Sequence, residues 1–227
     1  MQFLAAIIAT YYVKKYRAET SARYFSYFLW LTVIIETIGS FPILIDNLPS
    51  LAHLKDTSWE KNLWMYNIYL VVSFAFYMYY ISMHIYSRFL KKSLYALIIL
   101  YLSTSTINLI ISDVFFKAFS SYSFILGSLS LLITIGLYFY QVLQSNDILN
   151  FGYTIPFYFS IGVLVFHLCV TPLFIYSKYN SRIVSPEFVD IYGIILTIAN
   201  IFLYTCYTLG FIICSQQKKT SRENRSY

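Results

Sequence analysis

A single carboxyl group in the middle of an apolar run is the most informative feature of the sequence. Glu36 follows Val33-Ile34-Ile35 and lies about twelve residues into an apolar run over residues 24–45. A charged side chain at the centre of a bilayer costs roughly 3 kcal/mol on insertion scales. Glu36 therefore has to pair, contact water or stay protonated. We interpret it as a site for an ion, a proton or a small-molecule ligand. The alternative is a protonated carboxyl that only holds helices together.

His167 is the second ionisable side chain at such a depth. It lies about thirteen residues into an apolar run over residues 154–177. Taken alone, a histidine at this position is interpreted as a core residue that is satisfied by a hydrogen bond. With a carboxyl group at similar depth elsewhere, it could share a proton with Glu36 near neutral pH. This pairing requires that the two helices face each other.

Two prolines follow these ionisable residues within the same runs. Pro42 comes after Glu36, and Pro172 comes after His167. Each proline removes one helical hydrogen bond and tends to kink its helix. We therefore predict hinges at both positions and a small cavity open to the outer side. The alternative is that both prolines are ordinary residues of membrane helices and form neither a hinge nor a cavity.

Amide side chains add further polar groups inside apolar runs. Asn67, Asn108 and Asn200 are the three, and Tyr69 accompanies the first of them in Asn67-Ile68-Tyr69. Asparagine is costly against lipid, so these side chains are expected to face the protein interior. Hydrogen bonding between helices is one interpretation. Lining of a ligand pocket around Glu36 is the other, and we include all four residues in the candidate site.

Signatures of enzymes and cofactors are missing from the sequence. It contains no H-E-x-x-H and no G-x-S-x-G, which mark metalloproteases and α/β-hydrolases. Its three histidines are far apart, and its three cysteines lie in or at the end of apolar runs. We predict no metal site, no cofactor and no disulfide framework. An enzyme is the less favoured interpretation.

The elements that must position these residues are membrane helices. Apolar residues make up 59% of the 227 residues and charged residues only 11%, against about 25% charged in soluble domains. Continuous apolar runs of this length predict helices and exclude a barrel. We predict an all-α bundle of seven transmembrane helices in one domain over residues 1–215, followed by a basic tail over residues 216–227. The expected spans lie near residues 1–16, 24–45, 63–86, 94–112, 119–143, 154–177 and 188–215, the first being short.

The basic residues predict the orientation of this bundle. One set of connections, including the tail, carries eleven Lys and Arg residues, and the opposite set carries five. By the positive-inside rule the richer set is cytoplasmic, which places the N-terminus outside and the C-terminus inside. This clustering between apolar runs accounts for the net charge of +6 and argues against nucleic-acid binding.

Similar local patterns recur in the two halves of the chain. Glu36 precedes Pro42 as His167 precedes Pro172, and Asn67-Ile68-Tyr69 matches Asp190-Ile191-Tyr192 in position. Three spans, one linking span and three further spans would then form parallel repeats, which occur in transporters. We state this as a possible three-plus-one-plus-three arrangement.

Several short motifs also suggest a known family. They are Tyr11-Tyr12-Val13-Lys14-Lys15, Glu36, Tyr66-Asn67-Ile68-Tyr69, the segment Phe151 to Gly162, and Asn200 with Tyr204. On these the chain resembles small seven-helix membrane proteins of Bacteroidota-type bacteria. The resemblance implies this architecture and a bacterial inner-membrane location, and no activity. That family often has a second acid after the Asn-x-Tyr motif, where this chain reads Val71-Val72-Ser73-Phe74, which puts a two-carboxylate site in doubt.

Two functional interpretations follow for a multi-pass protein of the inner membrane. In the first, the protein binds a small molecule or ion around Glu36, as a transporter or a sensor. In the second, it is a structural or accessory subunit that binds a membrane partner or a second copy of itself, and has no ligand site. A membrane-embedded enzyme that modifies lipid is a weaker third interpretation.

Overall fold

The structure is a computed structural model in which residues 1–16, 18–47, 50, 53, 55, 57, 59, 61–145, 151–176 and 185–223 are described. Throughout these residues the regular structure is helical, so the predicted all-α class is confirmed. The elements are α1 (Gln2–Tyr16), α2 (Thr20–Gly39), α3 (Phe41–Asn47), α4 (Leu63–Ser82), α5 (Arg88–Ile111), α6 (Val114–Lys117), α7 (Ser121–Leu143), the 3-10 turn η3 (Phe151–Tyr153), α8 (Ile155–Ile175) and α9 (Pro186–Glu223).

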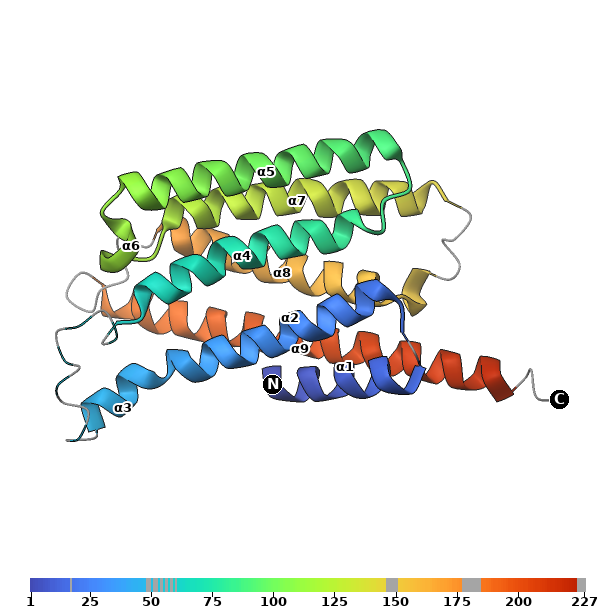
Figure 1. Ribbon diagram of the computed structural model, residues 1–227, viewed down its shortest axis with the longest axis horizontal. Helices are drawn as coiled ribbons and strands as arrows, with labels where there is room; N and C mark the ends of the chain where they lie inside the picture. The colour runs from blue at the N-terminus through green and yellow to red at the C-terminus, as the bar shows by residue number, and fades with distance from the viewer. Residues whose placement is uncertain are drawn as a thin grey trace.

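The long helices lie side by side and alternate in direction along the chain (Figure 1). Helix α4 packs against α5 and α7, and α7 packs against α8. Helix α9 packs closely along α8 and also contacts α1, which in turn packs against α2. Helices α2 and α4 touch far less than α8 and α9 do. The bundle is therefore tightly closed on one side and looser between α2 and α4.

Five segments are long and apolar enough to cross a bilayer. They are Thr20–Ile45, Arg88–Ile111, Ser121–Leu143, Ile155–Ile175 and Pro186–Thr220. Each has at least 21 residues, and a crossing of about 30 Å needs about 20. The chain is therefore a multi-pass membrane protein with five candidate spans.

The predicted count of seven spans is not supported, because the runs at residues 1–16 and 63–86 contain no candidate span by length and composition. Helix α1 has 15 residues, which at 1.5 Å per residue gives about 22 Å, short of the hydrocarbon thickness. Helix α4 has 20 residues and ends at Ser82. It carries five tyrosines, Asn67 and two serines, and it is not among the five candidate spans. An uninterrupted run that includes many tyrosines is therefore less apolar than its length suggests.

The two predicted hinges behave differently. The chain breaks between α2 and α3 at Ser40, and Pro42 lies in the first turn of α3, where a missing N–H costs little. The carbonyl of Ile38, which Pro42 leaves unpaired, accepts a hydrogen bond from Asn62 Nδ2 at 3.2 Å. Pro172 lies inside α8, which continues to Ile175 as one helix. Asn62 thereby fixes the break in α2 against the start of α4.

Candidate ligand-binding cavity

A cavity of about 660 Å³ lies among α2, α4, α8 and α9 and the start of α7. Its wall includes residues from the first turn of α4, the first turn of α7 and the last turn of α8. These three turns lie at one end of the bundle (Figure 1). Four of the predicted site residues line this cavity, namely Glu36, Tyr69, His167 and Asn200.

Among the described residues that line the cavity, Glu36 is the only acidic one. One turn earlier on α2, Thr32 Oγ1 hydrogen-bonds the hydroxyl of Tyr69 on α4 at 2.7 Å. Residues four apart share a helix face, so this bond turns Glu36 toward α4 and the cavity. Within the described part of the chain, no hydrogen bond or ion pair reaches the Glu36 carboxyl. Glu36 as a residue is exposed and lines the cavity, which leaves its side chain open to a ligand.

His167 lies deeper, enclosed by aromatic rings. Its side chain is 4% exposed, and its ring centroid lies 4.8 Å from that of Phe74 and 5.6 Å from that of Phe124. Its Nδ1 is 3.3 Å from the Ser128 hydroxyl. Among the described residues it makes no ion pair with Glu36. The predicted Glu36–His167 pair is therefore not formed, although both groups line the same cavity.

Asn200 and Tyr204 face the cavity from α9. Asn200 Nδ2 donates to the Leu196 carbonyl in its own helix at 2.9 Å. Its Oδ1 accepts no hydrogen bond from the described residues. The amide oxygen is therefore available as an acceptor on the wall opposite α2.

Asn67 and Asn108 lie outside this cavity, contrary to their inclusion in the candidate site. Asn67 is fully buried and donates to the carbonyls of Phe115 and Ala118 at 3.0 and 2.9 Å. Its Oδ1 accepts from the Ser120 N–H at 2.9 Å. Asn108 Oδ1 accepts from the Ser120 hydroxyl at 3.3 Å. Both amides hold the connection between α5 and α7, as buried amides usually do.

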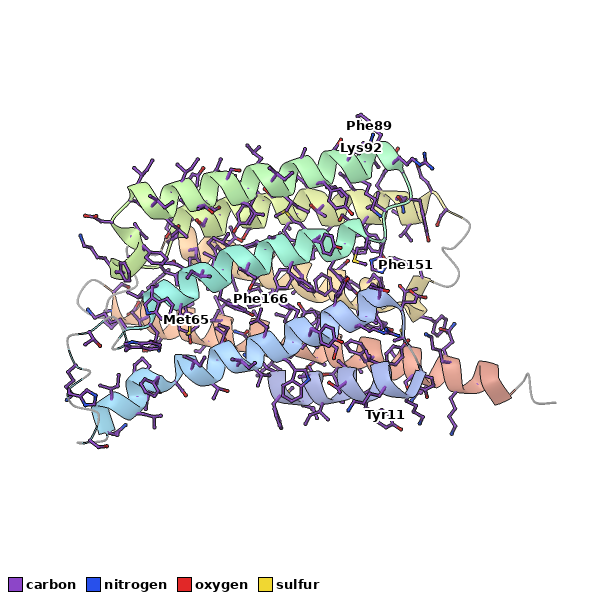
Figure 2. The ribbon with its side chains drawn as sticks, in the orientation of Figure 1. Tyr11, Met65, Phe89, Lys92, Phe151 and Phe166 are labelled. Atoms are coloured by element: carbon purple, nitrogen blue, oxygen red, sulfur yellow. The ribbon has the colours of Figure 1, made fainter. Side chains whose placement is uncertain are left out.

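Aromatic side chains make up most of the remaining wall, and sequence reasoning did not select them. They include Tyr66, Phe119, Phe166, Phe174 and Tyr192. Phe166 lies inside the bundle (Figure 2). With 47 aromatic residues in the chain (24 Tyr, 20 Phe and 3 Trp), no local signal distinguishes the rings that line a cavity from those that fill the core.

The chemistry of the cavity is one carboxyl group among aromatic rings, amides and hydroxyls. No Lys or Arg lines it within the described part of the chain. No cluster of three metal-ligating side chains occurs among the described residues either. No family model, curated protein or solved structure matches this chain. The arrangement of side chains is therefore the basis for any functional assignment.

Proposed function

We propose that this membrane protein binds a small organic cation in the cavity around Glu36. The observation that carries the proposal is an unpaired carboxyl group in an aromatic cavity without Lys or Arg among the described residues. A cation gains from the carboxylate by charge pairing and from the ring faces by cation–π attraction, and both are stronger where water is excluded. An anion would find no Lys or Arg there among the described residues.

The size and composition of the cavity favour an organic cation over a bare metal ion. A volume of about 660 Å³ is typical of sites for small molecules. Ca²⁺ or Mg²⁺ needs six or more oxygen ligands, whereas this wall offers one carboxyl group with the amide of Asn200 and a few hydroxyls. An aromatic or methylated ammonium compound uses the rings as well as the charge.

We also propose that α4 crosses the bilayer, giving six crossings. Helix α2 and helix α5 run in the same direction in Figure 1, and α4 is the long helix that returns between them. Its tyrosines face neighbouring helices in part, and Tyr80 is 1% exposed. A helix whose polar groups are covered by protein need not be as apolar as one that faces lipid.

The basic residues support an orientation in a bacterial inner membrane. One end of the bundle, which we name the basic end, carries Lys14, Lys15, Arg23, Arg88, Lys91, Lys92, Lys218 and Lys219. The described residues at the opposite end include Lys55, Lys61 and Lys117. The positive-inside rule makes the basic end cytoplasmic. The cavity with Glu36 then reaches toward the outside, and α9 ends in the cytoplasm.

The pairing of helices is compatible with the proposed parallel repeat. In that arrangement α1, α2 and α4 correspond to α7, α8 and α9. A two-fold relation then requires that α1 packs against α9 and that α7 packs against α4, and both contacts occur. The two halves differ in one respect, because α2 and α4 are loosely packed whereas the corresponding α8 and α9 are closely packed. The cavity lies beside this loose pair.

Binding of N-methyl-4-phenylpyridinium, an aromatic cation, to the purified protein in detergent tests the proposed function. We expect saturable binding by the wild type and at least about tenfold weaker binding by Glu36→Gln, since a lost tenfold corresponds to about 1.4 kcal/mol of charge pairing. Glu187→Gln removes an exposed carboxyl at the start of α9 and serves as the control. It should bind like the wild type.

Two results would contradict the proposal. One is an absence of saturable binding to the wild type, which would favour the structural or accessory interpretation. The other is equal binding by Glu36→Gln and wild type. That result would make Glu36 a residue that only joins helices.

A further inference from the structure

A second cavity lies at the basic end of the bundle. It has a volume of about 410 Å³ and is lined by the start of α2, the end of α4, the end of α7, the start of α8 and the end of α9, together with residues of α1 and η3. Its polar side chains include Glu19, Tyr80, His84 and Lys218. Phe151, also in its wall, is labelled at this end in Figure 2, as is Lys92. The same five helices line both cavities, from opposite ends.

Along α4 the two cavities are one helical turn apart. Tyr77 lines the cavity with Glu36, and Tyr80 lines the cavity at the basic end. Three residues along a helix correspond to about 4.5 Å. Along α9, Tyr204 lines the first cavity and Cys214 lines the second, with Tyr207 and Phe211 between them.

Four aromatic side chains fill the space between the cavities, and we name them the aromatic barrier: Phe25, Tyr80, Phe159 and Tyr207. Each is at most 1% exposed. The ring centroid of Phe159 lies 5.0 Å from that of Phe25, 4.5 Å from that of Tyr80 and 5.5 Å from that of Tyr207. Tyr77 meets Phe159 at 5.5 Å from the side of the first cavity. The barrier consists of side chains alone, so rotation of rings or a small helix shift would open it.

The closed barrier leaves a polar group unpaired. The hydroxyl of Tyr80 is buried and has no hydrogen-bond partner among the described residues. A buried hydroxyl without a partner is unfavourable. An open arrangement that admits water or a polar ligand between the rings would give the Tyr80 hydroxyl a partner. This would offset part of the packing energy that is lost when the barrier opens.

Each cavity has one acidic side chain among the described residues that line it. Glu19 lines the basic-end cavity as Glu36 lines the other. No hydrogen bond or ion pair reaches the Glu19 carboxyl from the described residues. The ammonium of Lys218 is 5.4 Å from the centre of the Tyr12 ring, so the lysine at this mouth contacts an aromatic ring. A cation therefore meets one carboxyl on either side of the barrier, and neither carboxyl has a partner among the described residues.

We propose that the protein carries the organic cation across the bilayer, between the two cavities and through the aromatic barrier. This inference rests on the proposed function, because it takes the same ligand at the same Glu36 site. With the basic end in the cytoplasm, the inside-negative membrane potential drives the cation inward. The barrier prevents free leakage, and Glu19 receives the cation on the cytoplasmic side.

Uptake by proteoliposomes tests the carrier activity. The full chain is reconstituted, an inside-negative potassium diffusion potential is set, and entry of radiolabelled N-methyl-4-phenylpyridinium is measured beside its binding in detergent. We expect uptake by the wild type above that of empty liposomes. Glu19→Gln should lower uptake about tenfold while binding at the Glu36 site changes less than about twofold. Glu187→Gln should change neither.

A second variant examines the barrier. Phe159→Leu keeps an apolar side chain but removes the ring that contacts the other three, so we expect uptake to rise about threefold or more with binding retained, since gating steps often limit turnover. Phe89→Leu alters a 77% exposed ring on α5 and should leave uptake unchanged.

The outcomes separate the two proposals. Binding by the wild type with uptake equal to empty liposomes overturns the carrier inference and leaves the proposed function standing. Absence of binding overturns the proposed function itself. Normal uptake by Glu19→Gln contradicts the role of the basic-end cavity. Unchanged uptake by a folded Phe159→Leu contradicts the barrier.

Discussion

His84 shows at the scale of one residue how position within the bundle alters an ordinary side chain. It lies in the turn between α4 and α5, half-buried in the wall of the basic-end cavity. Burial lowers the pKa of its imidazole below the usual 6.5, and Lys91 lowers it further. The hydrogen bond from Nδ1 to the Tyr80 carbonyl, at 3.0 Å, and the charge of Glu19 act in the opposite direction. The net effect favours the neutral ring.

This lowered pKa predicts a loss of stability in acid. The unfolded chain binds the His84 proton more tightly than the folded chain, so the free energy of unfolding decreases as the pH falls below about 6.5 toward the folded-state pKa. We expect the Tm in detergent to fall between about pH 7.5 and about pH 5.5. His84→Gln should reduce that fall, and His53→Gln should not. Identical pH profiles of His84→Gln and wild type would exclude His84 as the cause.

Helix α7 shows at the scale of one element how small residues permit close packing. Ser123, Gly127, Ser130 and Thr134 recur at spacings of three and four, and their shared face meets α4. A Cβ added at Gly127 would lie 2.6 Å from the ring of Phe74, whereas one at Gly136 would meet nothing within 4 Å. The helix therefore has room for a larger side chain at Gly136 but not at Gly127.

Alanine substitutions on α7 measure this difference. Gly127→Ala forces Phe74 to move, and such overpacking costs about 1–3 kcal/mol. Gly136→Ala gains helix propensity of up to about 1 kcal/mol at no steric cost. Denaturation of the detergent-solubilised variants should show the first destabilised and the second not. Since Phe74 also lines the cavity beside His167, Gly127→Ala should weaken ligand binding as well. Equal stability of the two variants would contradict this account of α7.

The whole molecule has an unequal distribution of charge between its ends, and this predicts which end faces the cytoplasm. Lys117 ends α6 at the end away from the basic cluster, and Thr220 lies near the end of α9 at the basic end. A membrane-impermeant maleimide applied to intact cells should label a cysteine at Lys117→Cys. It should label Thr220→Cys only after the cells are opened. The reverse pattern would invert the orientation and, with it, the proposed direction of transport.

The sequence by itself determined the class of the molecule and its most informative residue. Long apolar runs can satisfy their backbone in lipid only as helices, so the all-α membrane bundle followed from composition and run length. A charge in hydrocarbon is costly wherever its neighbours lie, so Glu36 stood out without a structure. The number of spans did not follow, because α4 forms a continuous run only when its five tyrosines count as apolar, and it is not among the candidate spans.

Only the tertiary structure decided which polar groups share a site. Glu36 lies on α2, far in sequence from His167 on α8 and Asn200 on α9, and the packing of these helices places all three around one cavity. Asn67 has the same side chain as Asn200 and a similar apolar context, yet its amide is fully used by the connection from α6 to α7. The rotation of each helix about its axis is set by packing against its neighbours. The direction in which each polar side chain points therefore depends on contacts between distant segments. A local pattern of residues does not predict it.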